Sequence, residues 1–237
     1  MENMESKQWN LLSAALECAT LRTLFVHGPP GTGKSFGAYT IGLRGRPLFA
    51  VTLTEDTPAA ELRGHYIPGA DGRFAWHHGP GAQAFIDGGR LVVNEISHAA
   101  PDVQSLLYAL GDSPDTARIT LPTGETILPA PGFQLILTDN AGPEQLPAAL
   151  RDRMDGTVKI ETPNPVAILK FPEVLRSAIW TCATIGDESR RVSLRSWDAI
   201  GRLLNGGMLL EDAVRLALPE NGQEVLDAFR IATTVGA

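Results

Sequence analysis

The stretch that decides the fold reads Leu24-Phe25-Val26-His27-Gly28-Pro29-Pro30-Gly31-Thr32-Gly33-Lys34-Ser35. Its apolar first part predicts a buried strand, and its second part fits the phosphate-loop pattern G-x-x-x-x-G-K-[ST] at every fixed position. Glycines in such a turn allow positive φ angles and let backbone N–H groups approach a phosphate. We therefore expect the residues from Gly28 to Ser35 to bind a triphosphate. Lys34 is expected to neutralise its charge, and Ser35 to place a hydroxyl on Mg²⁺.

Length and composition are those of a globular protein with one ordinary domain and room for a small second one. The 237 residues carry a formal net charge of −7, which argues against a protein whose main task is coating nucleic acid. No apolar run is long enough to span a bilayer, and Met1–Lys7 lacks the character of a signal peptide. Cys18 and Cys182 are expected to be buried free thiols. These features predict a cytoplasmic protein that does not enter the membrane.

Strand and helix patterns alternate over the first two thirds of the chain. The predicted strands are Thr23–His27, Pro47–Leu53, Arg90–Glu95, Phe133–Thr138 and Gly156–Ile160. The predicted helices are Gln8–Cys18, Phe36–Leu43, Glu55–Leu62, Gly81–Asp87, Pro101–Leu110 and Leu146–Met154. Two hairpins are predicted as well, one turning at Asp71-Gly72 and one, Arg118–Leu128, turning at Thr123-Gly124. This alternation predicts an α/β fold with a parallel five-stranded sheet sandwiched by helices.

Strand signals vanish after the segment Thr162-Pro163-Asn164-Pro165. The predicted helices beyond it are Ile168–Ala183, Leu194–Leu204, Glu211–Leu218 and Gln223–Thr233. We therefore predict a nucleotide-binding core over residues 1–163 with two inserted hairpins, followed by a small helical domain over residues 164–237.

Polar residues that could act on a phosphate lie at the end of one predicted strand and just after another. Glu95 ends a strand about sixty residues after the phosphate loop, where a carboxylate can activate the attacking water. The alternative is an ordinary carboxylate in a strand-end turn. Asn94 precedes it, and an Asp here would hold Mg²⁺ more strongly through its waters. Asn140 follows the next buried strand and could orient the same water; the alternative is a helix cap or turn residue.

Arginines follow in two later segments. Arg151 and Arg153 could reach the γ-phosphate held by a neighbouring subunit and stabilise charge in the transition state. The alternative is a solvated basic face paired with Asp152 and Asp155. Arg195 opens a helix of the second domain and could also reach the phosphates, although this signal is weak by itself.

Taken together, these motifs resemble the AAA+ ATPases, in particular the MoxR-like and dynein-related group that also contains the NorQ/CbbQ and McrB-type motors. Gly28–Ser35 matches the Walker A motif, Leu91–Glu95 matches Walker B, and Thr138–Asn140 matches sensor 1. The first hairpin resembles the insert in the second helix that marks this group, and the second hairpin resembles the one before sensor 1. The sequence departs from the family at Asn94, where Asp is usual, and at Met154, where Phe is usual.

This resemblance implies a P-loop NTPase core with a small all-α lid, and the binding of ATP and Mg²⁺, with Ser35 and Asn94 on the metal side. Glu95 would be the catalytic glutamate and Asn140 the functional amide of sensor 1. Arg153 would be the arginine finger, with Arg151 as a second candidate, and Arg195 falls where sensor 2 is expected. It further implies a homo-oligomeric ring, usually of six subunits, with ATP bound between neighbours. Such rings remodel client proteins, often by way of a partner with a von Willebrand A domain.

Other functions stay open at this point. A nucleotide-dependent assembly scaffold with weak turnover is suggested by Asn94, and it predicts that Asn94→Asp raises Mg²⁺-dependent turnover. A nucleic-acid translocating motor of restriction type would use Arg73 and Arg118 on the hairpins to line a basic pore, but the acidic balance does not favour it. A small-molecule P-loop kinase is a more distant alternative.

Overall fold

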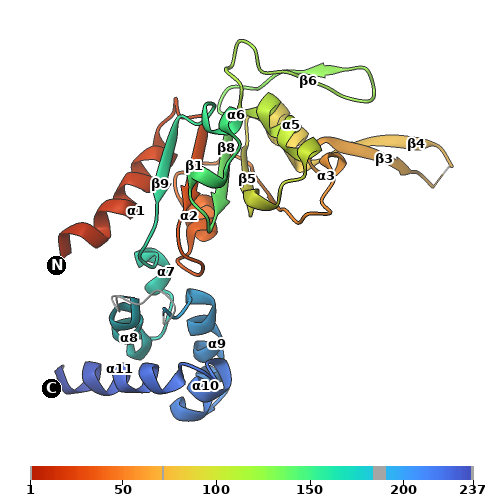
Figure 1. Cartoon of the computed structure of the whole chain (residues 1–237). Helices are drawn as coiled ribbons and strands as arrows, with labels where there is room; N and C mark the ends of the chain where they lie inside the picture. Colours follow the sequence, from red (N-terminus) through yellow and green to blue (C-terminus); the bar gives the residue numbers. More distant parts are fainter. Residues whose placement is uncertain (1, 71, 184–190, 236–237) are drawn as a thin grey trace. The chain divides into compact units, whose positions relative to one another are not determined.

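The computed structural model describes residues 2–70, 72–183 and 191–235 (Figure 1). The contacts between residues that lie close in space divide the chain into two compact units. One comprises residues 10–28 and 35–159, and we call it the core unit. The other comprises residues 1–9, 29–34 and 160–237, and we call it the helical unit. The predicted domain boundary after residue 163 stays a prediction.

A five-stranded parallel sheet forms the centre of the core unit, as the sequence predicts. Its strands are β1 (Thr23–His27), β2 (Leu48–Thr52), β5 (Arg90–Asn94), β8 (Gln134–Asp139) and β9 (Gly156–Lys159). Their order is β2-β5-β8-β1-β9, and every neighbouring pair is parallel. The carboxyl ends of all five strands therefore share one edge of the sheet, and their amino ends share the other.

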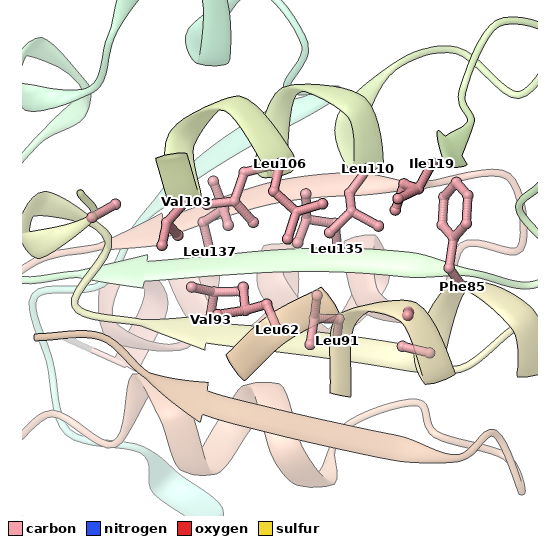
Figure 2. Close-up of a cluster of buried hydrophobic side chains, with 14 of the residues drawn as sticks. Leu62, Phe85, Leu91, Val93, Val103, Leu106, Leu110, Ile119, Leu135 and Leu137 are labelled. Atoms are coloured by element: carbon pink, nitrogen blue, oxygen red, sulfur yellow. The ribbon is translucent and has the colours of Figure 1, made fainter. Parts of the chain in front are cut away.

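Helices cover both faces of this sheet, as Figure 1 shows. They are α1 (Glu2–Glu17), α2 (Lys34–Thr40), α3 (Ala59–Arg63), α4 (Pro80–Asp87), α5 (Pro101–Gly111) and α6 (Ala148–Arg151). Alternate strand residues face opposite ways, so Leu91 and Val93 of β5 and Leu135 of β8 pack beneath α5 and α3 on one side (Figure 2). The main hydrophobic core lies on that side.

On the opposite face of the sheet, Arg90 links the strand β5 to the helices that cover it. Arg90 is the first residue of this buried strand and, although charged, is fully buried. Its guanidinium donates to the carbonyls of Ala38 at 2.9 Å and Ile41 at 2.6 Å, near the end of α2, and of Leu16 at 3.1 Å, in α1. Burial, with a smaller contribution from the nearby charge of Arg46, lowers the pKa of Arg90 to about 10. Arg90 thus fixes the far end of the helix that begins at the phosphate loop.

Both predicted hairpins are present in the core unit, although Asp71, in the turn predicted for the first one, lies outside the described residues. The first pairs β3 (Gly64–Pro68) with β4 (Phe74–His78), and the second pairs β6 (Ile119–Thr120) with β7 (Thr126–Ile127). On the first hairpin the rings of Tyr66 and Trp76 meet edge to face with centroids 5.2 Å apart.

The helical unit contains α7 (Pro165–Ile168), α8 (Glu173–Ala183), α9 (Leu194–Asn205), α10 (Leu210–Ala217) and α11 (Gly222–Val235). Its core is centred on Trp197, which is fully buried and lies with its ring 6.0 Å from that of Phe229. Ser193 caps α9 by accepting the N–H of Ser196, and Asn164 caps α7. These caps fix the starts of both helices.

Prolines account for two differences from the predicted helices. The helix predicted over Ile168–Ala183 is two helices, because Pro172 lacks an N–H and disfavours helical backbone in the residue before it. The helix predicted over Leu146–Met154 extends only over Ala148–Arg151, because Leu146 precedes Pro147 and is extended, with ψ 141°.

The two cysteines also differ from one another. Cys18 is exposed beyond the end of α1, so its predicted burial is wrong. Cys182 is buried, and this burial raises the pKa of its thiol to about 11. In the part of the chain that the structure describes, the helices are too short or too polar to cross a bilayer.

Candidate functional site

The loop after β1 bends through glycines with positive φ angles. The angle is 134° at Gly28, 74° at Gly31 and 90° at Gly33, values that other residues adopt only with strain. Lys34 and Ser35 then begin α2, and the first N–H groups of a helix have no acceptor within it. The segment therefore offers backbone N–H groups, an ammonium group and a hydroxyl. This donor set fits a phosphate chain with a divalent cation.

The ammonium group of Lys34 lies over the loop's own backbone. Lys34 is buried, and its Nζ donates to the Pro29 carbonyl at 2.8 Å. The hydroxyl of Thr32 donates to the same carbonyl at 3.2 Å. A charged phosphate oxygen is a stronger acceptor than a carbonyl, so phosphate binding can draw Lys34 from this position.

The middle of the loop, residues 29–34, belongs to the helical unit and is contacted by other segments of that unit. The N–H of Leu194 donates to the Gly31 carbonyl at 2.8 Å, and the N–H of Asn164 donates to the Thr32 carbonyl at 2.8 Å. A Cβ on Gly31 would collide with Ser193, so a glycine is required there. Arg195 comes directly after Leu194, in the first turn of α9, and its side chain is exposed. The predicted sensor 2 arginine is thus one residue from a contact with the loop.

Two of the predicted catalytic residues meet at the carboxyl edge of the core sheet. The register pairs Asn94 with Thr138, so Glu95 and Asn140 follow neighbouring strands. The Nδ2 of Asn140 donates to Oε2 of Glu95 at 3.4 Å. The amide and the carboxylate are therefore close enough to contact one small molecule, such as a water.

Glu95 adopts a left-handed backbone conformation, with φ 57° and ψ 51°. A non-glycine residue in this region costs on the order of 1 kcal/mol, and such residues persist where their surroundings enforce them, often at functional sites. The strain therefore supports a functional role for Glu95 over an ordinary strand-end turn.

The sequence did not single out Asp139, which lies between the segment of Glu95 and the segment of Asn140. It is 4% exposed. Its Oδ2 accepts the N–H of Ser97 at 2.6 Å, and its Oδ1 accepts the N–H of Ala141 at 2.9 Å. The signal in the sequence is a charged residue at the end of a strand with an apolar centre, because charged residues are rarely buried without a specific partner.

Asn94 forms hydrogen bonds at both ends of its amide and is 5% exposed. Its Nδ2 donates to the Tyr39 hydroxyl at 2.6 Å and to the Val51 carbonyl at 3.2 Å, and its Oδ1 accepts from Thr138 at 2.9 Å. Because a carbonyl only accepts, the atom facing Val51 must be the nitrogen. The predicted part of Asn94 in binding Mg²⁺ stays a prediction. Among the described residues, no group of three or more His, Cys, Asp or Glu could hold a metal ion.

Arg153 lies at the amino edge of the core sheet and is partly buried. Its Nη1 donates to the Ala149 carbonyl at 2.8 Å, its Nε lies 3.8 Å from Oδ1 of Asp112, and its guanidinium carbon lies 5.5 Å from the centre of the Tyr108 ring. The acidic partner is thus Asp112, where the sequence suggested Asp152 and Asp155.

A polar cavity of about 330 Å³ opens beside Arg153. It is lined by Arg22, Thr23, Gly111, Asp112, Ser113, Pro114, Asp152, Arg153 and Asp155. The Nε of Arg153 is buried here without a hydrogen-bond partner, so this guanidinium is incompletely satisfied. Arg151 is exposed at the end of α6.

Comparison with known proteins gives three relevant similarities. Residues 23–154, more than half of the chain, match the family model described as AAA domain (dynein-related subfamily). Protein NorQ of Paracoccus denitrificans is 35% identical over 58% of this chain and 52% of its own length. Protein CbbQ of Hydrogenophilus thermoluteolus is 30% identical over 64% of this chain and 55% of its own length. The chain thus spans about half the length of these curated relatives.

The fold has a match among solved structures. NtrX from Brucella abortus superposes with a TM-score of 0.58 at 14% identity, over 98% of this chain and 51% of that chain. At this identity the likeness concerns the fold alone.

Proposed function

Because this chain belongs to the dynein-related subfamily of AAA domains, we propose that it binds ATP and hydrolyses it to ADP and phosphate with the help of Mg²⁺. Membership in this family confirms the resemblance seen in the sequence. The family implies nucleotide binding and, in general, ATPase activity. The observation that carries the proposal is the strained Glu95, whose carboxylate accepts a hydrogen bond from Asn140 at the carboxyl edge of the sheet.

In the proposed reaction the loop residues bind and the strand-end residues act. The loop N–H groups and Lys34 hold the phosphate oxygens, and the Ser35 hydroxyl is the proposed protein ligand of the metal. Bound Mg²⁺ would supply positive charge that offsets the negative charge of the phosphates. Glu95 accepts the proton of a water that attacks the γ-phosphorus, while Asn140 orients that water. The bond from the γ-phosphorus to the bridging oxygen breaks, and ADP leaves with the electron pair.

We further propose that the active site is shared between copies of the chain. Arg153 is tied to the start of β1, because the Thr23 hydroxyl donates to the Arg153 carbonyl at 2.7 Å. Glu95 lies at the opposite edge of the same parallel sheet, a strand length of about 16 Å away. Arg153 is therefore remote from Glu95 of its own chain and suited to the phosphates bound by a neighbour.

A head-to-tail contact of this kind closes into a ring when the rotation between copies allows it. The ring of six, the remodelling of a client protein and an adaptor with a von Willebrand A domain are inferred from the family resemblance. The first hairpin supports a role in contacting a partner, because its Phe74 is 70% exposed and its Tyr66 47%. Arg195 is proposed to reach the phosphates from α9.

A mixing experiment tests the shared site. The ATPase rate is measured for Glu95→Gln, for Arg153→Ala and for an equal mixture of the two. Each variant alone is expected to lose nearly all turnover. In a randomly mixed ring about a quarter of the interfaces combine an intact Glu95 with an intact Arg153, so about a quarter of the wild-type rate should return.

A matched control mixes Glu95→Gln with Lys34→Ala. Both changes affect the chain that binds the nucleotide, so no interface can regain a complete site and no rate should return. If the first mixture also stays inactive although both proteins assemble, the shared site is wrong. If Glu95→Gln alone retains the wild-type rate, the hydrolytic role of Glu95 is wrong as well.

A further inference from the structure

Asp139 bonds to both segments of the candidate catalytic site. Its Oδ2 accepts the N–H of Ser97, two residues after Glu95, and its Oδ1 accepts the N–H of Ala141, which follows Asn140. We propose that Asp139 is a positioning residue, which holds Glu95 and Asn140 in their working arrangement without contacting the nucleotide. This inference rests on the proposed function.

The conformation of Glu95 explains why such a residue is needed. Glu95 occupies the left-handed region, which a side chain other than glycine leaves unless its neighbours prevent it. Before it, the Asn94 carbonyl accepts the N–H of Leu53 at 3.0 Å, so the end of β5 is fixed. After it, the short helix η1 (Ile96–His98) has Ile96 buried in the core and Ser97 bonded to Asp139. The backbone is thus held both before and after Glu95, and Asp139 provides the polar restraint after it.

The second oxygen of Asp139 acts on the turn that carries Asn140. Its bond to the Ala141 N–H closes this turn over Asn140, whose Nδ2 in turn donates to Glu95. One carboxylate therefore sets the backbone on both sides of the contact between the amide and the acid. Displacement of either turn would separate the two groups that are proposed to hold the attacking water.

The two hydrogen bonds that Asp139 accepts require a carboxylate. Asp139 is almost fully buried, and each of its oxygens accepts one backbone N–H. Asparagine has the same shape but offers one oxygen only, so its NH₂ group would face the N–H of Ser97 or of Ala141. One buried N–H would lose its acceptor, and the turn that carries it would be released.

The test is steady-state kinetics of the full-length assembled protein, with Asp139→Asn as the main variant. We expect kcat to fall roughly ten- to hundredfold, the effect of one unpaired buried group on a catalytic arrangement. The affinity for ATP, measured by equilibrium binding, should stay within about threefold, because Asp139 does not contact the nucleotide. A double variant with Glu95→Gln should be no slower than Glu95→Gln alone, because Asp139 acts through Glu95.

Asp102→Asn is the matched control. Asp102 also uses one oxygen for each of two backbone N–H groups, those of Ala59 and Val103, at 2.9 Å each. The same chemical change is made there on an exposed residue outside the proposed site, and kcat should stay within about twofold of wild type. If Asp139→Asn fails to fold or assemble, Asp139→Ser replaces it. Thermal unfolding and ring assembly are measured first, to show that the variant is folded and assembled.

The outcomes separate the two proposals. A folded Asp139 variant with wild-type kcat, beside an inactive Glu95→Gln, overturns the positioning role and leaves the proposed function in place. A loss confined to ATP affinity also overturns it. If Glu95→Gln keeps its activity, the hydrolytic role proposed for Glu95 fails, and the positioning role fails with it.

Discussion

One aspartate at each edge of the core sheet accepts two backbone N–H groups, but the two differ in burial and in geometry. Asp139 at the carboxyl edge is 4% exposed and uses a separate oxygen for each N–H. Asp155 at the amino edge is exposed, and a single oxygen accepts the N–H groups of Arg22 and Thr23, at 2.7 and 3.0 Å. A hydrogen-bonding pattern alone therefore does not identify a functional aspartate. Burial and the conformation of the neighbouring residues must be weighed with it.

The two edges also differ in the side chains that they present. The carboxyl edge holds the acid and amide of Glu95 and Asn140, which can act on water, whereas the amino edge holds the guanidinium of Arg153. In a single chain the two sets cannot act together, because a strand length separates them. This division of chemistry is what a head-to-tail assembly would unite.

The largest expected effect comes from removing the guanidinium at the amino edge. Arg153→Ala should lower kcat about 10³-fold in the assembled protein, the lower end of the range for an arginine finger. Arg153→Lys should recover only part of this rate, because a lysine cannot form the bidentate contact. The measurement is the ATPase rate at protein concentrations above assembly, with oligomeric state checked for each variant.

Arg151→Ala is the control for this prediction. Arg151 lies on the same short helix as Ala149 but is exposed, and the sequence alone left it as a second candidate. A larger loss for Arg151→Ala than for Arg153→Ala would exchange the two roles. It would also make the contact of Arg153 with Asp112 a structural one.

A smaller effect is expected from Asn94→Asp at the carboxyl edge. A carboxylate here would bring an oxygen against the Val51 carbonyl, where the amide nitrogen now donates at 3.2 Å. The unfavourable contact should lower the free energy of unfolding by about 1–3 kcal/mol, measured by urea denaturation. Turnover should not rise.

This outcome would weaken the scaffold alternative, because the uncharged residue would then serve the fold. An increase in Mg²⁺-dependent turnover, with stability unchanged, would instead support the view that Asn94 limits hydrolysis. Asn205→Asp, at the exposed end of α9, controls for the added charge alone.

Much of the fold was predictable because its signals are local. The five strands are apolar runs that end in turns, and the glycines of the phosphate loop have the positive φ angles that the motif requires. Glu95 and Asn140 could be placed together because the carboxyl ends of neighbouring parallel strands meet at one edge.

The remaining features depend on contacts between distant segments. Asn94 donates to Tyr39 and Val51, and no spacing in the sequence predicts that these residues are its partners. Asp139 appeared only as a neighbour of Asn140, because its role depends on how η1 folds back after Glu95. Arg153 meets Asp112 for the same kind of reason, since the end of α5 reaches the start of β1 only in the folded chain.

The smallest effect is expected from Asp155→Asn, at the amino edge of the sheet. One oxygen of Asp155 accepts both N–H groups, so the oxygen of an asparagine can replace it while the NH₂ group turns toward solvent. The loss should therefore be about 0.5–1 kcal/mol in the free energy of unfolding, that of weakening two charge-assisted bonds, with kcat within about twofold of wild type. Urea denaturation and ATPase rates of this variant and of Asp139→Asn, measured side by side, check the prediction. If both variants lose kcat equally, the edges are not distinct, and the two aspartates act on hydrolysis through the stability of the sheet as a whole.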